Sequence, residues 1–419
     1  MFTRPGSTLV VVCWVAAFFG QGGGARAESG STLDNTRWTE RVSFRPRLVR
    51  LPSSVGEKVD RTNLQHVAVF LPDGLKTLIA KYHLELALGE YTAVHPSIPY
   101  IQATAANLGR SKPVDPGPAG KAWGLSGYQG GLPFPAPQNA LEVAWNMACA
   151  YRGDDSLVRA TLLSISAARG VERKEEVRFS WISTLYRTDV LPRPALPGFA
   201  DKKISRIFSF EVLAPPEKKG FRGELSELVW PENSPKEIHL PPWERVIRGS
   251  LRAGDVWNAT DWLYGDLLGF DGHPERMLWK LSGKGTYLLP IHAGLGLRPG
   301  EASGAVAIGQ WPHWNPRMRF EPRPVFLLEA WPRLSDHPYG RVVFYVDAET
   351  FLVICKEAYD RQGALQKVFL YGFNGSSDLD RLPLEWAVWL AVDLASEHAT
   401  VLVPLEQSAN VGRFPPENK

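Results

Sequence analysis

The stretch RVVFYVDAETFLVICKEAYDRQGALQKVFLYG, residues 341–372, consists of three apolar runs separated by two short polar turns, DAET and DRQG. The runs occupy residues 341–347, 351–359 and 364–372 and are rich in β-branched and aromatic side chains, which favour strands. Turns of this length join neighbouring antiparallel strands. The stretch therefore predicts a three-stranded antiparallel meander.

Similar runs indicate that the sheet is much larger than this meander. Residues 386–392 and 399–403 are a candidate final hairpin, and residues 203–213, 243–251 and 276–289 are candidate earlier strands. The 15 Trp, 38 Gly and 34 Pro also favour strands and turns. We expect on the order of ten strands, which must close, or nearly close, on themselves to avoid exposed edges.

Two amphipathic helices are predicted before most of these strands. The first has Asp73 as its N-cap, ends at Gly89 and carries an apolar stripe of Leu75, Leu78, Ile79, Tyr82 and Leu86. The second is capped by Asn139, with Glu142 reaching back in a capping box, and ends at Gly153. Its inner face carries Leu141, Trp145, Ala148 and Cys149. The predicted fold is α+β but mainly β, a curved antiparallel sheet that forms a half-open barrel around helices.

A proline-rich segment leads into the second helix. Pro133, Pro135 and Pro137 fix φ and remove backbone donors, so this segment is expected to be extended and to lie outside the middle of a sheet. Phe134, held between two prolines, must pack on the body of the protein or face a groove.

The N-terminus has the features of a secretory signal peptide. Arg4 makes the start basic, residues 7–20 are apolar, and residues 25–27 form an A-x-A cleavage site. A membrane anchor is the alternative, but the apolar run is shorter than the ~20 residues that cross a bilayer. No membrane span is therefore expected after cleavage. The predicted organisation is a signal peptide at 1–27, an extended arm at 28–63, one half-barrel domain at 64–407 and a tail at 408–419.

Charge and cysteine content limit the partners. The formal charge is +3 from 47 basic and 44 acidic residues without a long run of one sign, so no nucleic-acid partner is expected.

Cys149 and Cys355 remain after signal cleavage and could form a disulfide in an oxidising compartment. Each lies in an apolar predicted element, so two buried free thiols are favoured.

Catalytic and metal-binding patterns are missing from the sequence. It contains no Gly-x-Ser-x-Gly, His-Glu-x-x-His, Cys-x-x-Cys or P-loop pattern, and no two of its nine His lie four residues apart. We therefore predict no catalytic residue, metal or cofactor, and no enzymatic activity. A secreted glycan hydrolase that uses Asp261 or Asp266 stays an alternative because Trp and Asp are dense in that region.

Apolar and aromatic side chains provide candidates for a hydrophobic cavity, although they could equally fill a large β core. The cavity candidates are Phe134, Leu141, Trp145, Trp257, Trp262, Phe270 and Trp279. Basic side chains beside an apolar strand could bind an anionic head group, and these candidates are Arg317, Arg319 and Arg323. The alternative for the arginines is a solvated strand edge whose charge discourages aggregation.

Two blocks, residues 130–153 and 318–367, resemble the domain-of-unknown-function 1329 family of Gram-negative envelope proteins, and residues 261–290 between them fit the same pattern. The resemblance implies a periplasmic protein with a fold similar to the lipoprotein carriers LolA and LolB. It also implies association with a permease of the resistance-nodulation-division class or with an outer-membrane partner.

Three functions are compatible with these observations. The leading hypothesis is a periplasmic carrier or accessory protein that holds a lipid-like small molecule. The second is a structural adaptor of an envelope permease complex whose concave face is packed by its own side chains, and the third is the glycan hydrolase. A void of several hundred Å³ under the sheet would favour the carrier. A void plugged by Trp145 and its neighbours would favour the adaptor.

Overall fold

The computed structural model describes residues 10–13, 47–50, 57–114, 124–229, 234–240, 245–251, 254–294, 302–375 and 383–412. Most of the predicted signal peptide and arm, and the end of the predicted tail, lie outside these described residues. Within the N-terminal region, β1 (Val10–Cys13) pairs antiparallel with β2 (Arg47–Arg50).

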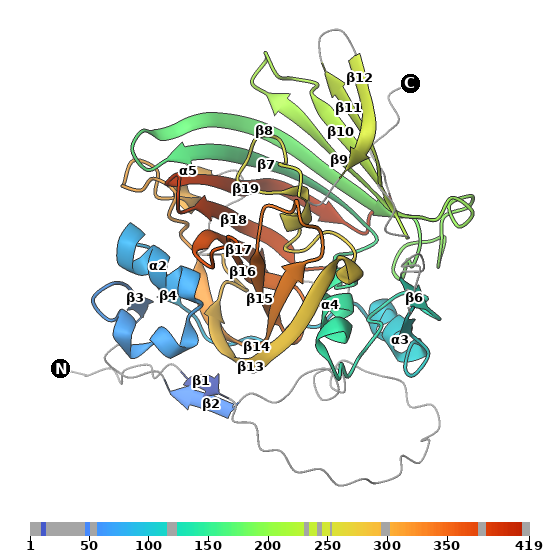
Figure 1. The fold of residues 1–419 in the computed structure, drawn as a ribbon, viewed down its shortest axis with the longest axis horizontal. Helices are drawn as coiled ribbons and strands as arrows, with labels where there is room; N and C mark the ends of the chain where they lie inside the picture. Colours follow the sequence, from blue (N-terminus) through green and yellow to red (C-terminus); the bar gives the residue numbers. More distant parts are fainter. Residues whose placement is uncertain are drawn as a thin grey trace, which may run out of the picture.

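One sheet of 15 strands dominates the molecule (Figure 1). Neighbouring strands pair antiparallel except for β14 and β4, which are parallel, and β13 (Met277–Leu289) pairs with β14 beside the main path. The order along the path is β12 (Arg245–Leu251), β11 (Ser234–Leu240), β10 (Arg222–Leu228), β9 (Ile204–Ala214), β8 (Gly170–Ser183), β7 (Asp155–Ser166), β19 (His398–Ala409), β18 (Glu385–Asp393), β17 (Leu365–Asn374), β16 (Val353–Tyr359), β15 (Arg341–Asp347), β14 (Arg319–Pro332), β4 (Leu86–Leu88) and β3 (Lys58–Val59).

The sheet curves strongly but does not close, since its path ends at β12 and at β3 without these strands pairing (Figure 1). Helix α2 (Asp73–Tyr82) packs against β17, and α4 (Ala140–Ala148) packs against β13. The prediction of a mainly β, half-open barrel around helices is confirmed.

The predicted meander forms β15, β16 and β17, with Cys355 opposite Tyr345 on one side and Leu370 on the other. β16 begins two residues later than predicted because the turn before it is longer. Asp347 Oδ1 accepts from the backbone N–H groups of Glu349 at 3.1 Å and of Thr350 at 2.9 Å, which closes the turn through a side chain.

Strands β7 and β8 are not among those predicted from the sequence. Residues 172–176 of β8 are all charged, a pattern more typical of a loop, but in the structure charges of this region pair across strands. Arg159 on β7 contacts Glu176 on β8 at 2.6 Å and also binds Glu406 on β19 at 2.5 Å. Opposite charges on facing strands stabilise a sheet, so the solvated face of these strands can be highly charged.

Helix α2 begins at Asp73, but Asp73 is its first residue and not its N-cap. The backbone N–H of Gly74 is instead satisfied by Glu357 Oε1 of β16 at 2.6 Å, a contact between residues far apart in the sequence. The helix ends at Tyr82 because His83 adopts a left-handed conformation with φ 56°. The prediction that the helix continues past Tyr82 and ends at Gly89 is therefore wrong.

The remaining elements are short or were not predicted. Helix α3 (Ile98–Ala106) is capped by Ser97, whose Oγ accepts from the backbone N–H of Tyr100 at 3.3 Å. The others are the strands β5 (Lys112–Pro113) and β6 (Leu125–Ser126), the 3₁₀ turns η2 (Leu64–His66), η3 (Ala68–Phe70), η4 (Tyr264–Asp266) and η5 (Pro274–Arg276), and the helical turn α5 (Ala302–Ala305).

An inserted loop, residues 254–276, fills much of the core beside the helices. Trp257 is fully buried, with its ring centroid 5.4 Å from that of Phe179 on β8 and 5.7 Å from that of Phe210 on β9. Asp266 anchors the same loop, because its Oδ1 accepts from Lys356 Nζ at 2.7 Å and its Oδ2 accepts from Tyr339 Oη at 2.7 Å. The loop therefore fills part of the concave side, beside the helices.

Candidate functional site

Helix α4 and its caps form one wall of the candidate site. Asn139 Oδ1 accepts from the backbone N–H of Glu142 at 3.0 Å, as predicted. The carboxylate of Glu142 reaches back to the backbone N–H of Gln138 at 2.6 Å, one residue earlier than a standard capping box. The helix ends at Ala148, with Cys149 as its C-cap, and not at Gly153.

The proline-rich lead-in is fixed to α4 by a single buried side chain. Asn146 Oδ1 accepts from the backbone N–H of Phe134 at 3.0 Å, and Asn146 Nδ2 donates to the Phe134 carbonyl at 2.6 Å. The segment belongs to no strand, as predicted, and bends at Pro133 and Pro135. Because both backbone groups of Phe134 are satisfied by the helix, the segment and α4 form one rigid unit.

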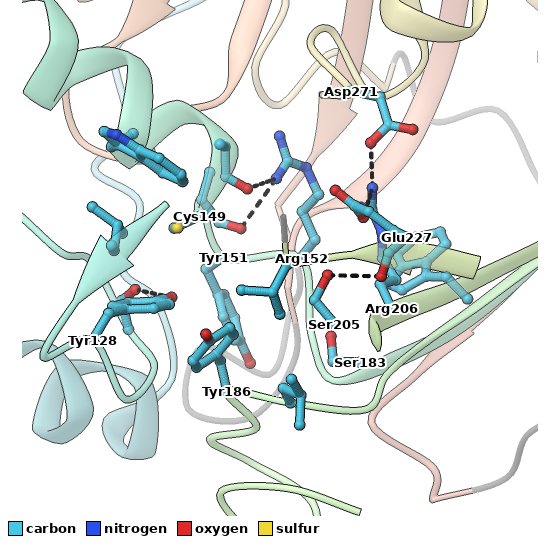
Figure 2. A pocket seen from close by; sticks show the side chains of 18 of the residues that line it. Tyr128, Cys149, Tyr151, Arg152, Ser183, Tyr186, Ser205, Arg206, Glu227 and Asp271 are labelled. Carbon is cyan, nitrogen blue, oxygen red and sulfur yellow. Dashed lines mark hydrogen bonds and ion pairs between the residues drawn. The ribbon is translucent and has the colours of Figure 1, made fainter. Parts of the chain in front are cut away.

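The end of α4 opens onto a cavity of about 180 Å³, which we call the arginine pocket. Figure 2 shows its labelled side chains, contributed by the turn after α4, by the ends of β8, β9 and β10, and by the loop before β13. The residues that define it are Trp145, Cys149, Arg152, Tyr186, Arg206 and Asp271.

The two arginines of this pocket have different surroundings. Arg206 contacts Glu227 at 2.8 Å and also pairs with Asp271, so its charge is compensated (Figure 2). Arg152 is half-buried and has no carboxylate within ion-pair distance among the described residues. It donates only to main-chain carbonyls, which lie 3.2–3.5 Å away and belong to Met147, Ala148, Ala150 and Leu268.

Burial changes the acidity of several groups around the arginine pocket. It lowers the pKa of Arg152 to about 10, with the nearby charge of Arg206 acting in the same direction. Arg152 therefore stays a cation at neutral pH. Burial also raises the pKa of the Cys149 thiol to about 12 and lowers the pKa of His273 to about 4, so both are uncharged at neutral pH.

A second and more apolar cavity, of about 250 Å³, lies beside the first. We call it the tryptophan pocket and define it by Trp181, Leu268, Leu352, Phe373, Trp386 and Trp389. Trp386 stacks on Trp389 with 3.9 Å between ring centroids and on Trp181 with 5.6 Å. Tyr151, Arg152 and Trp181 line both pockets, so the cationic group lies where the two meet. Each cavity exceeds the ~150 Å³ that accommodates benzene in an apolar core.

The predicted cavity residues do not all come together. Trp145 and Phe270 line the arginine pocket. The other five line neither of the two pockets. Trp257 and Trp262 are buried in the core, Trp279 packs on Phe270 and Phe344, and Phe134 and Leu141 are half-buried near α4.

The three predicted head-group arginines are also separated by the fold. Arg317 and Arg319 are exposed. Arg323 is fully buried and contacts Asp347 at 2.8 Å, Glu349 at 2.6 Å and Glu321 at 2.9 Å, which leaves it no free face for a ligand.

Sequence reasoning missed the residues that combine charge with cavity. Arg152 lies four residues after the end of α4, and a basic residue near a helix end usually satisfies the carbonyls there, so nothing in the pattern distinguishes it. Trp386 and Trp389 were assigned to a hairpin strand. Their spacing of three puts them on opposite faces of a regular strand, and only the close stacking in the structure reveals that both contact the same cavity.

One hydrogen-bond chain has the composition of a catalytic triad. Ser164 Oγ lies 2.9 Å from His398 Nε2, and His398 Nδ1 lies 2.8 Å from Asp261 Oδ2. However, Thr400 donates to the same Asp261 oxygen at 2.7 Å, and none of the three triad residues lines either pocket. The chain therefore ties β7, β19 and the inserted loop together. Among the described residues, no group of three His, Cys, Asp or Glu is arranged to hold a metal ion.

A family model described as "Protein of unknown function (DUF1329)" matches residues 58–418. The chain belongs to this family. The resemblance found in the sequence is thus confirmed.

Cys149 and Cys355 are both free thiols, which is the alternative that the sequence favours. Within the part of the chain that is described, no helix is both long enough and apolar enough to span a membrane.

One curated relative is similar to part of this chain. The uncharacterised protein PA3922 of Pseudomonas aeruginosa is 27% identical over 264 residues, which cover 58% of this chain and 53% of the relative. The chain thus spans about half the length of this curated relative.

Two solved structures are similar in fold. One is a putative outer membrane lipoprotein-sorting protein domain from Vibrio parahaemolyticus, with a TM-score of 0.45, 15% identity and coverage of 66% of this chain and 94% of that one. The other is a DUF1329 family protein from Desulfovibrio piger, with a TM-score of 0.44, 14% identity and coverage of 65% and 93%.

Proposed function

We propose that this protein is a periplasmic carrier or accessory protein that binds a hydrophobic, lipid-like molecule in the tryptophan pocket. The observation that carries the proposal is an unfilled cavity of about 250 Å³ lined by three tryptophans, on a sheet that does not close. Flat aromatic side chains provide a large contact area for an apolar ligand at a low cost in conformational entropy.

The sequence supports the compartment. The signal-peptide pattern at residues 1–27 would direct the chain out of the cytoplasm, and the family resemblance points to the Gram-negative envelope. A role with an envelope transport system would follow if the ligand has to pass between the two membranes. An association with a permease or with an outer-membrane protein is proposed on the same grounds.

The cavities favour the carrier over the adaptor. Trp145 lines the arginine pocket without filling it, and the tryptophan pocket is likewise open space. An adaptor whose concave side is packed by its own residues would have no use for either cavity, and empty apolar volume destabilises a core.

Binding can be tested with protein purified from periplasm. Solvent extraction followed by mass spectrometry should recover a lipid, and the delipidated protein should take up a fluorescent fatty acid. Ala409 lines the tryptophan pocket, so Ala409→Trp should fill the cavity and reduce uptake, whereas Ala168→Trp in an exposed turn should not. A protein that carries no lipid and takes up neither fatty acids nor neutral lipid probes would refute the carrier function.

A further inference from the structure

The charge of Arg152 has no acidic partner at the place where the two pockets meet. Among the described residues, the four groups that accept from its guanidinium are neutral carbonyls, at 3.2–3.5 Å. By contrast, the neighbouring Arg206 has two carboxylates, Glu227 and Asp271. Arg152 is thus the arginine of this site that makes no ion pair among the described residues, and the charge of Asp271 acts on it only from beyond contact distance. A cation that has lost part of its hydration is costly unless an anion lies against it.

The other acids near the arginine pocket are already engaged. Asp154 accepts from the backbone N–H groups of Thr188, Asp189 and Val190, with its Oδ2 at 3.1, 2.7 and 2.7 Å. Asp189 accepts from the Tyr151 hydroxyl at 3.1 Å. The carboxylates of the pocket thus serve the backbone, a tyrosine or Arg206, and none of them reaches Arg152.

Two further donors among the described residues that line the arginine pocket have no acceptor. Trp145 is 7% exposed and its indole N–H has no acceptor, and the Nε–H of Arg206 is buried without one. Both residues belong to the same pocket as Arg152. Donors that have no partner in the protein are characteristic of a site completed by the oxygens of a ligand.

The apolar side of the site begins at the same arginine. Arg152 and Trp181 line both pockets, and the tryptophan pocket continues from them to Trp386, Trp389 and Phe373. A cation at one end and stacked aromatic rings at the other match a molecule with an anionic head and an apolar tail.

We propose that the ligand is an anionic amphiphile, whose carboxylate or phosphate group binds Arg152 and whose hydrocarbon tail lies in the tryptophan pocket. This inference rests on the proposed carrier function and specifies the class of its ligand. Arg152 then selects for charge, while the tryptophans bind any chain that fits.

Ligand charge provides the first test and requires no variant. A fluorescent fatty acid bound to the delipidated protein is displaced in parallel by palmitate, by a lysophosphatidate, by hexadecanol and by hexadecylamine at pH 7.5. We expect the two anions to bind at least tenfold more tightly than the alcohol, the difference given by one charge-assisted hydrogen bond, and the amine to bind least well. The ratio between palmitate and the lysophosphatidate distinguishes a carboxylate from a phosphate head.

Variants at Arg152 provide the second test. Arg152→Met should lower the affinity for palmitate about tenfold or more and leave hexadecanol within about twofold, and Arg152→Lys should restore part of the preference. Arg317→Met, which removes an exposed arginine outside both pockets, is the matched control and should change neither affinity.

The outcomes separate this inference from the carrier function. Equal binding of acid and alcohol by the wild-type protein would mean that Arg152 only caps the end of α4, and would overturn the inference while leaving the carrier intact. A preference for anions that survives in Arg152→Met would also overturn it. Binding of none of the four compounds would refute the carrier function itself.

Discussion

Replacing Arg323 with Met removes the cation that three buried carboxylates share. Asp347 and Glu349 are 0% and 2% exposed and contact the guanidinium at 2.8 and 2.6 Å, so neither can recover its solvation. Glu321 keeps a second contact, to His292 Nδ1 at 3.2 Å. Asp347 and Glu349 also keep backbone donors, the N–H groups of Thr350 and Val94. Breaking one buried ion pair from one side costs ~3–5 kcal/mol, and since all three carboxylates lose their guanidinium here, we expect a loss of about 4–5 kcal/mol.

Urea unfolding followed by tryptophan fluorescence measures this loss. At the entropy of unfolding typical of a domain of this size, 4–5 kcal/mol corresponds to a fall in Tm of roughly 5–7 °C. The control is Arg317→Met, which removes an exposed arginine and should stay within ~0.5 kcal/mol of the wild type. A loss for Arg323→Met below about 1 kcal/mol would show that the three carboxylates do not depend on this arginine.

Three further predictions concern single side chains. Asn146→Ala removes both hydrogen bonds to the Phe134 backbone and should cost ~1–3 kcal/mol in urea unfolding, whereas a cost near zero would show that the proline segment is not fixed to α4. The pKa of His398 is raised above its usual value, mainly by its hydrogen bond to Asp261, with Glu172 and Asp393 adding to the effect. A raised pKa stabilises the fold below the unfolded value near ~6.5, and this contribution disappears as pH rises through the folded pKa. His398→Gln should therefore lose more stability at pH 5.5 than at pH 8.5, and a deficit that grows with pH would contradict this. Burial raises the pKa of the Cys149 thiol to about 12. At pH 8, iodoacetamide should therefore label Cys149 about a thousandfold more slowly in the folded protein than in the urea-unfolded chain. Rapid labelling of Cys149 in the folded protein would contradict a buried, protonated thiol.

The sequence predicts those elements whose structure depends on local interactions. The meander of β15, β16 and β17 follows from alternating apolar runs and short turns, and α4 follows from Asn139 and Glu142, which bond within four residues of each other. Helix α2 shows the limit of such reasoning. Its start is satisfied by Glu357 from another element, and its end is set by His83 in a left-handed conformation, for which His gives little warning.

The candidate site depends on contacts that no local pattern encodes. Arg323 could be paired with Asp347 only by knowing the register that puts Val325 opposite Asp347 between β14 and β15. Without that register, an arginine beside an apolar strand is equally compatible with an exposed anion site. The same holds for Arg152, whose lack of an acidic partner becomes visible only when every neighbouring carboxylate has been assigned to another group.

The tryptophan pocket lies at the seam where β7 pairs with β19, which joins the middle of the chain to its end, and it is lined there by Ser156 and Ala409. Trp181 of β8 meets Trp386 of β18 across this seam, and residues 149–154 and Leu268 of the inserted loop complete the lining. The meander of β15, β16 and β17 contributes no residue to the arginine pocket and only Leu352 and Phe373, at its turns and end, to the tryptophan pocket. The other block that resembles the family, residues 130–153, lines the arginine pocket with Trp145, Cys149 and Arg152. The meander is therefore largely separate from the residues that would define the ligand. Changing a few residues at helix and strand ends would alter the pockets without altering the strand pairing.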